Sequence, residues 1–259
     1  MGSADERATV TLKKIYRGMN CPVLVTKPRA AELIKYTSNA LLATKISFIN
    51  EIARLCEKLG VSVEEVARGV ALDRRIGPHF LRAGIGFGGS CFPKDTAALL
   101  DVAKQHNATV EIVEKAIHVN QTQYVYFLEN ARKILRTFRH KRLAIFGLSF
   151  KPGTDDLRES RALLLIQKLL AEGAYVSVHD PVAKLPPALH SSNIVQHDTA
   201  QRTAAHAHAI IICTEWPQYE QLDWQKIRKT METAYVFDGR NMLDGEAMRA
   251  IGFYYRGIG

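Results

Sequence analysis

The residues best suited to chemistry lie in a short run around one cysteine. A glycine-rich stretch at 84–89 precedes Cys91, and Pro93, Lys94 and Asp95 follow it. A helix is expected to begin near Pro93, so the thiol would lie at a helix N-terminus, where backbone N–H groups and the Lys94 ammonium both stabilise a thiolate. Asp95 comes four residues after Cys91 and so on the same helical face. A thiolate beside a carboxylate favours covalent catalysis followed by base-assisted hydrolysis.

The glycine-rich stretch formally matches the GxGxxG pattern of dinucleotide-binding folds, but its surroundings argue against that interpretation. No strand is expected before it, and the helix after it begins with Ser-Cys-Phe-Pro, so the βαβ setting is missing. We expect the glycines to let the backbone approach a ligand closely just ahead of Cys91, with Ser90 as the cap of the helix.

A lone cysteine is most often a small core residue, and we assign Cys21, Cys56 and Cys213 to that role. The four cysteines lie far apart, with no CxxC pair and no cluster of metal-ligand spacing, so we expect four free thiols and no metal site. Cys91 differs from the other three because a glycine loop and Asp95 accompany it.

Composition bounds the class of protein. The 259 residues are 47% apolar and 24% charged, which is typical of a globular chain with two modest cores. No apolar run approaches the roughly 18 residues that span a bilayer, and the start lacks a signal peptide, so we expect a cytoplasmic protein that binds no membrane. The net charge of +9 suggests an anionic partner. Because no nucleic-acid-binding signature accompanies it, a phosphate-bearing small molecule is the preferred partner.

The elements that must position these residues show two kinds of hydrophobic pattern. Long helical periodicity covers 28–59, which stops at Gly60, and about 110–138; a capping box at Ser62 opens a shorter helix between them. From 143 onward, short apolar strands alternate with helices, which predicts a parallel sheet wrapped by helices. The expected strands and helix of this part are 143–146, 175–178, 194–195, 209–212, 235–237 and the helix 158–171.

The sequence therefore predicts an α/β protein in which an all-helical central domain with two long helices precedes a Rossmann-like parallel-sheet domain. We place the central domain at 28–138 and the sheet domain at 139–259. Before them, 1–27 forms one αβ unit, with a helix at 5–19 and a strand at 23–26.

Three segments resemble the UDP-glucose/GDP-mannose dehydrogenase family. Gly86–Asp95 is similar to the family's active-site motif, in wording closest to the members that oxidise UDP-glucose, and Ala31–Asn39 and Phe146–Ser160 agree with two further family segments. The resemblance implies an NAD-dependent, two-step oxidation of UDP-glucose to UDP-glucuronate. It also implies a homodimer through the two long helices.

The resemblance assigns roles to individual residues. Cys91 would form a thiohemiacetal and then a thioester, Asp95 would be the base of the hydrolysis, and Lys35 and Asn39 would stabilise the oxyanion. Lys35 and Asn39 are four residues apart, hence on one helical face. Without the resemblance, a helical lysine or asparagine is more often a solvated surface residue.

Further residues match substrate or cofactor contacts of the family, and Arg75 matches an arginine that reaches the substrate across the dimer. The substrate set is Arg75, Phe80, Leu81, Arg82, Phe87, Gly88, Phe150, Lys151 and Arg240, and the cofactor set is Lys94 and Arg158. Cationic side chains suit a diphosphate, although each could also be an ordinary surface charge, Arg82 most of all.

One domain of the family is mostly not recognised in this sequence. Only the closing αβ unit of the family's N-terminal NAD-binding domain is recognised, at 1–27, and the remainder would be on the order of 150 to 200 residues. We therefore expect this chain alone to be inactive. Two alternatives stay open: a dehydrogenase for GDP-mannose or another nucleotide sugar, and a non-catalytic module that binds UDP-sugars and dimerises.

Overall fold

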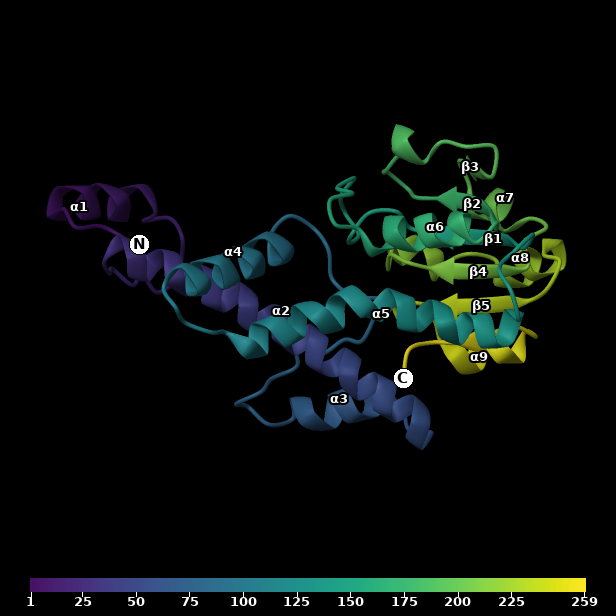
Figure 1. The fold of residues 1–259 in the computed structure, drawn as a ribbon, viewed down its shortest axis with the longest axis horizontal. Coiled ribbons are helices and arrows are strands. Elements are labelled where there is room, and N and C mark those ends of the chain that lie inside the picture. Colours follow the sequence, from purple (N-terminus) through teal and green to yellow (C-terminus); the bar gives the residue numbers. More distant parts are fainter.

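A single helix of 32 residues, α2 (Pro28–Leu59), runs through the middle of the helical part. Pro28 starts it, since the ring fixes a helical φ and the first turn needs no N–H from it. Gly60 ends it in the left-handed conformation at φ 69°, with its N–H bonded to the carbonyl of Cys56. The computed structural model describes all 259 residues, and Figure 1 shows this helix crossing beside α5.

Three further helices pack around α2. They are α3 (Val63–Ala71), α4 (Phe92–Gln105) and α5 (Glu111–Leu135). The hydroxyl of Ser62 accepts from the Glu65 N–H at 3.4 Å, so the predicted cap at Ser62 is confirmed. The second long helix ends at Leu135 instead of 138, because Arg136 adopts a positive φ of 70° that interrupts the helix.

The second half of the chain forms a six-stranded parallel sheet in the order β3-β2-β1-β4-β5-β6. Its strands are β1 (Arg142–Phe146), β2 (Tyr175–His179), β3 (Ile194–Gln196), β4 (Ala209–Ile212), β5 (Tyr235–Asp238) and β6 (Tyr254–Arg256). The connections include α6 (Arg161–Ala171), α7 (Ala200–Ala204), α8 (Trp224–Thr230), α9 (Gly245–Ala250) and the 3-10 turns η1 (Pro187–Leu189) and η2 (Pro217–Tyr219). This is the strand order of a doubly wound nucleotide-binding fold.

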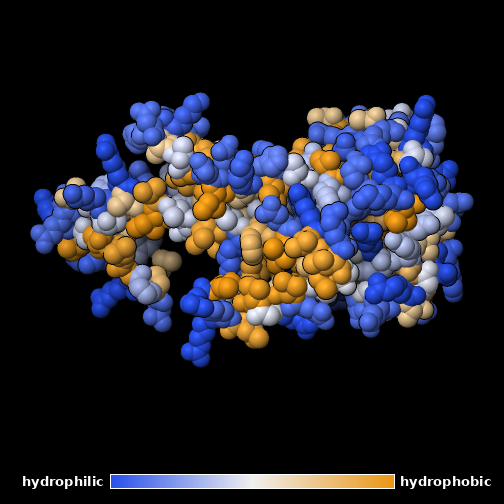
Figure 2. All heavy atoms as spheres, turned by 60° about the horizontal axis from the view of Figure 1, so that its bottom comes forward, coloured by the Kyte–Doolittle hydropathy of each residue, from blue (hydrophilic) through white to orange (hydrophobic).

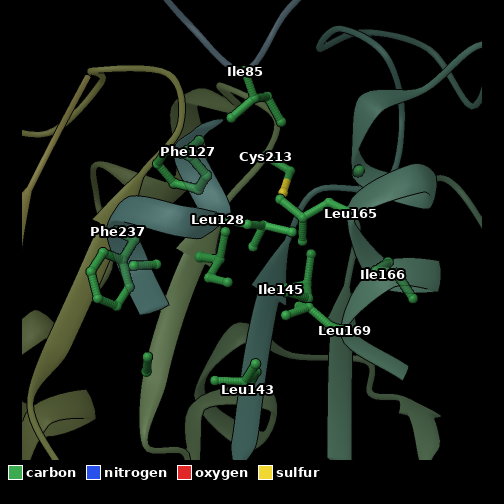
Figure 3. Close-up of a cluster of buried hydrophobic side chains, with 14 of the residues drawn as sticks. Ile85, Phe127, Leu128, Leu143, Ile145, Leu165, Ile166, Leu169, Cys213 and Phe237 are labelled. Atoms are coloured by element: carbon green, nitrogen blue, oxygen red, sulfur yellow. The ribbon is translucent and has the colours of Figure 1, made fainter. Parts of the chain in front are cut away.

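Alternation along the strands gives the sheet two apolar faces. Ala144 and Phe146 of β1 belong to a cluster with residues of α7, α8 and α9, whereas Leu143 and Ile145 face the opposite way. Figure 3 shows Leu143 and Ile145 beneath side chains of α6 and of α5, among them Leu165 and Leu128. Both faces are therefore covered, as the buried strand patterns require.

Helix α5 belongs to both parts of the molecule. It packs on α2, and its second half also contributes Phe127, Leu128 and Leu135 to the core of the sheet. Phe138, just after the helix, is also fully buried in that core. A continuous apolar cluster thus extends across the predicted boundary at 138/139, which stays a prediction.

The predicted α/β class, helical in the first half and a parallel sheet in the second, is confirmed. The strand predicted at 23–26 is wrong. That segment is extended but makes one bridge, between Thr26 and Gly2, because no neighbouring strand offers it a ladder of hydrogen bonds. The first helix, α1, covers Glu6–Ile15 and is shorter than predicted. The helix predicted at 158–171 begins at Arg161, after Ser160.

Candidate functional site

A cleft of ≈ 520 Å³ lies where the glycine-rich loop meets the loops after β1 and β4. Those two strands are neighbours at the point where the strand order reverses, and in such sheets ligands bind beyond the carboxyl ends of the strands. The cleft is lined by Ile46, Phe80, Arg82, Ala83, Gly86, Phe87, Gly88, Gly89, Ser90, Cys91, Phe92, Phe150, Lys151, Glu215 and Arg240. Both halves of the chain therefore contribute to one site.

The glycine-rich loop is anchored to the sheet half. The N–H of Ile85 donates to the carbonyl of Gly239 at 2.9 Å, and Figure 3 shows the Ile85 side chain pointing toward Cys213. A Cβ on Gly88 would stand 2.2 Å from the carbonyl oxygen of Glu159. The lack of a side chain at Gly88 thus lets two loops of the chain approach each other closely, whereas the sequence predicted a close approach to a ligand.

Two buried polar side chains hold the backbone of Phe87, and the sequence analysis missed both. Asn120 accepts from the Phe87 N–H at 2.7 Å and donates to its carbonyl at 3.0 Å. Arg161 donates to the same carbonyl at 2.8 Å. Burial lowers the pKa of Arg161, although the nearby Glu159 carboxylate opposes that shift. No local signal marks these residues, because both act from helices distant in sequence.

Cys91 stands at the start of α4 as its N-cap residue, and its side chain is exposed on the cleft. The predicted cap at Ser90 is wrong. The hydroxyl of Ser90 lies 3.8 Å from the Cys91 sulfur, and no side chain caps the helix, because the chain at Cys91 is already helical at φ −88° and ψ −63°. The thiol therefore belongs to the N-cap residue of a helix whose N-terminus has no side-chain cap. All four cysteines are unpaired; the core role predicted for Cys56 and Cys213 is confirmed, whereas the same prediction for Cys21 is wrong, because Cys21 is exposed.

Asp95, one turn after Cys91, is the centre of a buried polar cluster. Its Oδ2 accepts from Lys35 at 3.0 Å and from Asn39 at 2.6 Å, and its Oδ1 accepts from Lys94. Burial raises the pKa of Asp95 and is the largest single influence, but the donors Lys94, Lys35 and Asn39 together outweigh it and hold the pKa below its usual range. Asp95 is therefore a carboxylate at neutral pH.

The structure brings together the four residues assigned to chemistry, but it arranges them in two layers. Cys91 lines the cleft, whereas Asp95 lies one helical turn after it on α4 and binds both Lys35 and Asn39 of α2; none of these three lines the cleft. Lys35 keeps 60% of its side chain exposed, and only one of the three N–H donors of its ammonium is used by Asp95. The other two can bind a ligand. The oxyanion role of Lys35 and Asn39 stays a prediction.

Most predicted substrate contacts gather around the cleft. All of them line it except Arg75 and Leu81. Leu81 is a core side chain, and Arg75 is 89% exposed and paired with Asp73 at 2.6 Å. The distant Arg75 agrees with a residue expected to act across a dimer, a role that stays a prediction.

The cations of the cleft are Arg82, Lys151 and Arg240, and they come from three separate segments. Arg240 is the best fixed, since its Nε donates to the carbonyl of Cys213 at 2.7 Å and its Nη1 to that of Gly86 at 3.1 Å. Glu215, which the sequence analysis missed, lies beside Arg240 with 3.3 Å between Oε2 and Nε. Clustered cations in a partly enclosed cleft attract a diphosphate.

The two predicted cofactor contacts do not form a dinucleotide site. Lys94 is bound to Asp95, and Arg158 is 69% exposed in an ion pair with Asp156. Asp180, at the end of β2 where a ribose-binding acid would stand, is already occupied by the N–H groups of Leu148 and Ser149 at 2.7 and 3.0 Å. These contacts form no complete dinucleotide site, and the cofactor role of Lys94 and Arg158 stays a prediction.

Other site classes find no support in the chain. No three His, Cys, Asp or Glu side chains come together as a metal site. No helix combines the length and apolar character that a membrane crossing requires.

Comparison with known proteins gives two adjacent matches to one family. The central domain of the UDP-glucose/GDP-mannose dehydrogenase family matches residues 29–122, and the UDP binding domain of the same family matches residues 144–245.

Individual relatives agree. The chain is 39% identical to UDP-glucose 6-dehydrogenase TuaD of Bacillus subtilis, over 100% of this chain and 56% of the relative. It is 42% identical to a UDP-glucose 6-dehydrogenase of Pseudomonas aeruginosa, over 100% of this chain and 59% of the relative. A solved UDP-glucose dehydrogenase of Pyrobaculum islandicum superposes with a TM-score of 0.89 at 39% identity, over 99% of this chain and 57% of that one. The chain thus spans a little more than half the length of these relatives.

Proposed function

The chain belongs to the UDP-glucose/GDP-mannose dehydrogenase family, and on that premise we propose that it binds UDP-glucose and carries the thiol that holds its 6-carbon while that carbon is oxidised to a carboxylate. One observation supports this most: the exposed thiol of Cys91 lies in the same cleft as Arg82, Lys151 and Arg240. Cations suited to a diphosphate and a nucleophile suited to an aldehyde thus lie within one site.

The steps that this chain's own residues perform are addition and hydrolysis. The Cys91 sulfur adds to the carbon of an aldehyde, and the new oxyanion takes up a proton to give a thiohemiacetal. Loss of a hydride from that carbon and of the proton from its hydroxyl leaves a thioester, which water then cleaves to a carboxylate and the free thiol. Asp95 takes the proton of that water. Because Lys35 and Asn39 now donate to Asp95, their transfer to the substrate oxygen would leave Asp95 a stronger base.

Hydride removal needs an acceptor, which family resemblance gives as NAD. Of the family's cofactor contacts this chain offers only Lys94 and Arg158, which pair with neighbouring carboxylates in the free chain. We therefore propose that this 259-residue chain binds the nucleotide sugar without turning it over. Production of NADH from UDP-glucose by the purified chain would contradict this.

The proposed partner is a second copy of the chain. Ile34, Leu41, Phe48 and Leu55 recur every seven residues on α2 and are 48%, 62%, 52% and 51% exposed. Figure 2 shows hydrophobic surface over the central helices. A seven-residue apolar stripe on an exposed helix is typical of helix–helix association, and a self-complementary patch favours a two-fold dimer.

Two alternatives share the same cleft. A dehydrogenase of GDP-mannose or another nucleotide sugar would use the same thiol, because the chemistry at the 6-position is independent of the base. A non-catalytic UDP-sugar module would use the cations and leave Cys91 idle. The relatives described above are UDP-glucose enzymes, which supports the first proposal.

Calorimetric titration of the purified chain separates these possibilities. UDP-glucose, GDP-mannose and NAD are titrated one at a time, and binding of UDP-glucose alone is the expected result. Binding of GDP-mannose in its place would move the assignment to the first alternative. A Cys91→Ala variant that binds UDP-glucose equally well, yet loses covalent capture of the 6-aldehyde form, would separate the enzyme from the binding module.

A further inference from the structure

Glu215 is the acidic residue of a cleft whose other charged residues are cations. A carboxylate repels a diphosphate, so its place among Arg82, Lys151 and Arg240 requires a reason. The preceding and following residues fix its backbone firmly: the Thr214 hydroxyl donates to the carbonyl of Ser149 at 2.6 Å, and the indole of Trp216 donates to Asp180 at 3.2 Å. Glu215 is thus held at the cleft.

The ion pair with Arg240 leaves part of the hydrogen-bonding capacity of the Glu215 carboxylate unused. Its Oε2 is 3.3 Å from Nε of Arg240, but that N–H is already directed at the carbonyl of Cys213, at 2.7 Å. Oε2 is buried and has no hydrogen-bond partner. A buried carboxylate oxygen without a donor is costly, and the oxygen open to a ligand is Oε1, which is not buried and accepts no hydrogen bond.

The ligand group that binds the Glu215 carboxylate is expected to be a neutral hydrogen-bond donor. A phosphate oxygen is an acceptor and carries the same charge as Glu215, whereas a hydroxyl donates without charge. The side chain is 31% exposed, so a ligand in the cleft can reach the carboxylate. An accessible carboxylate oxygen accepts hydrogen bonds from the hydroxyls of a vicinal diol, as acidic residues of doubly wound folds do with ribose.

We propose that Glu215 is a specificity residue that accepts hydrogen bonds from a vicinal diol of the bound nucleotide sugar, while the neighbouring cations take the diphosphate. The inference rests on the proposed function, because it requires a nucleotide sugar in the cleft. The diol can belong to the ribose or to the hexose, and the experiment distinguishes them.

The test compares ligands with and without each diol on two proteins. UDP, 2′,3′-dideoxy-UDP, UDP-glucose and inorganic pyrophosphate are titrated into the wild-type chain and into Glu215→Ala. If the ribose diol is the partner, the wild type should bind UDP about tenfold or more tightly than the dideoxy compound, because a hydrogen bond to a charged group is strong. In Glu215→Ala this ratio should fall close to one. If the hexose diol is the partner, the UDP-glucose to UDP ratio should depend on Glu215 instead.

Pyrophosphate separates recognition from a structural role. Removal of a negative charge beside Arg240 should leave pyrophosphate affinity unchanged or increase it, whereas a disordered cleft would lose affinity for every ligand. Glu215→Gln serves as a second variant with nearly the same shape, and its unfolding midpoint reports on folding. Glu220→Ala is the matched control, since Glu220 is exposed, lies close in sequence and is absent from the cleft.

Failure of the two proposals can be told apart. A wild-type chain that binds no UDP or UDP-glucose overturns the proposed function and the role of Glu215 with it. A wild-type chain that binds UDP, with both diol ratios identical in Glu215→Ala, overturns the role of Glu215 alone and leaves it as the ion-pair partner of Arg240.

Discussion

The two residues proposed for chemistry differ in how the chain treats them. Cys91 is exposed at a helix start and has the hydroxyl of Ser90 as its neighbour at 3.8 Å. Asp95 is 4% exposed at its side chain and is tied to three donors. A nucleophile must touch its substrate, whereas the proposed base Asp95 acts on a water molecule and also holds two lysines in position. It can therefore lie one helical turn away from the thiol.

Selective labelling should identify the thiol. A small thiol reagent should modify Cys91 fastest, because Cys91 is the proposed nucleophile and is exposed on the cleft, and it should not reach the buried Cys56 and Cys213 in the folded chain. Cys21, which is also exposed, is the internal control. Mass spectrometry of the modified peptides, with and without UDP-glucose, checks this. Equal rates at Cys21 and Cys91, or no protection of Cys91 by the ligand, would contradict the site.

The cluster around Asp95 should make stability depend on pH. Since the folded chain holds the pKa of Asp95 below its ordinary value, the contribution is present above about pH 4 and is lost as pH falls through the folded pKa. Asp95→Asn should therefore lower the free energy of unfolding by about 1 kcal/mol at neutral pH, a modest figure because the lysines are mostly exposed. The deficit should shrink toward about pH 3.

Urea titrations at several pH values measure that difference. Asp101→Asn on the same helix is the control, as Asp101 is exposed, and it should change stability by less than about 0.5 kcal/mol. A deficit of Asp95→Asn that stays constant across the pH range would show that the ionised carboxylate is not its source.

At the residue scale, the sequence predicts which residues belong to the site better than it predicts which of them contact one another. A ten-residue run contains Cys91 and Asp95, and helical spacing relates Lys35 to Asn39. That the pair binds Asp95 depends on how α2 crosses α4, which no local pattern encodes. The positions of Asn120, Arg161 and Glu215 were missed for the same reason, because each acts on a segment far away in the chain.

At the scale of elements, the glycine-rich loop joins the halves of the molecule by close approach. Gly88 admits the Glu159 carbonyl, and Gly89 at φ +81° admits the ring of Phe150, whose nearest atom would stand 2.7 Å from an added Cβ. Helices and strands were predictable because burial imposes their periods. The segment at 23–26 misled the prediction because an apolar run alone cannot reveal whether a partner strand exists.

A methyl group in this loop should be destabilising. Gly88→Ala places a Cβ 2.2 Å from the Glu159 oxygen, so the two loops must separate, at about 1 to 3 kcal/mol of unfolding free energy. Affinity for UDP-glucose should fall as well, since Phe87 and Phe150 line the cleft on either side. Chemical denaturation and calorimetry measure the two effects.

Gly69→Ala is the matched control for that substitution. Gly69 lies inside α3 and an added Cβ there meets nothing within 4 Å, so alanine should raise stability by about 0.5 to 1 kcal/mol through helix propensity. Gly88→Ala with unchanged stability and unchanged ligand affinity would refute the tight junction of the two loops.

At the scale of the whole molecule, the apolar stripe of α2 predicts a dimer. Light scattering at micromolar concentration should give twice the chain mass of 28.9 kDa. Phe48→Glu places a charge in the stripe and should shift the chain to monomer. Val182→Glu is the control, because Val182 is equally exposed at 52% but lies in the sheet half. A monomeric wild-type chain, or dissociation by Val182→Glu as well, would count against the α2 interface.

The sharing of α5 between the two halves also decides how the cleft can respond to a ligand. This helix packs on α2 and, in its second half, also on the strands, with Leu128 and Ala131 fully buried. Because one helix packs against both halves, we expect it to restrict closure of one half over the other. The cleft is therefore preorganised, and a nucleotide sugar that fits should bind without a large conformational penalty.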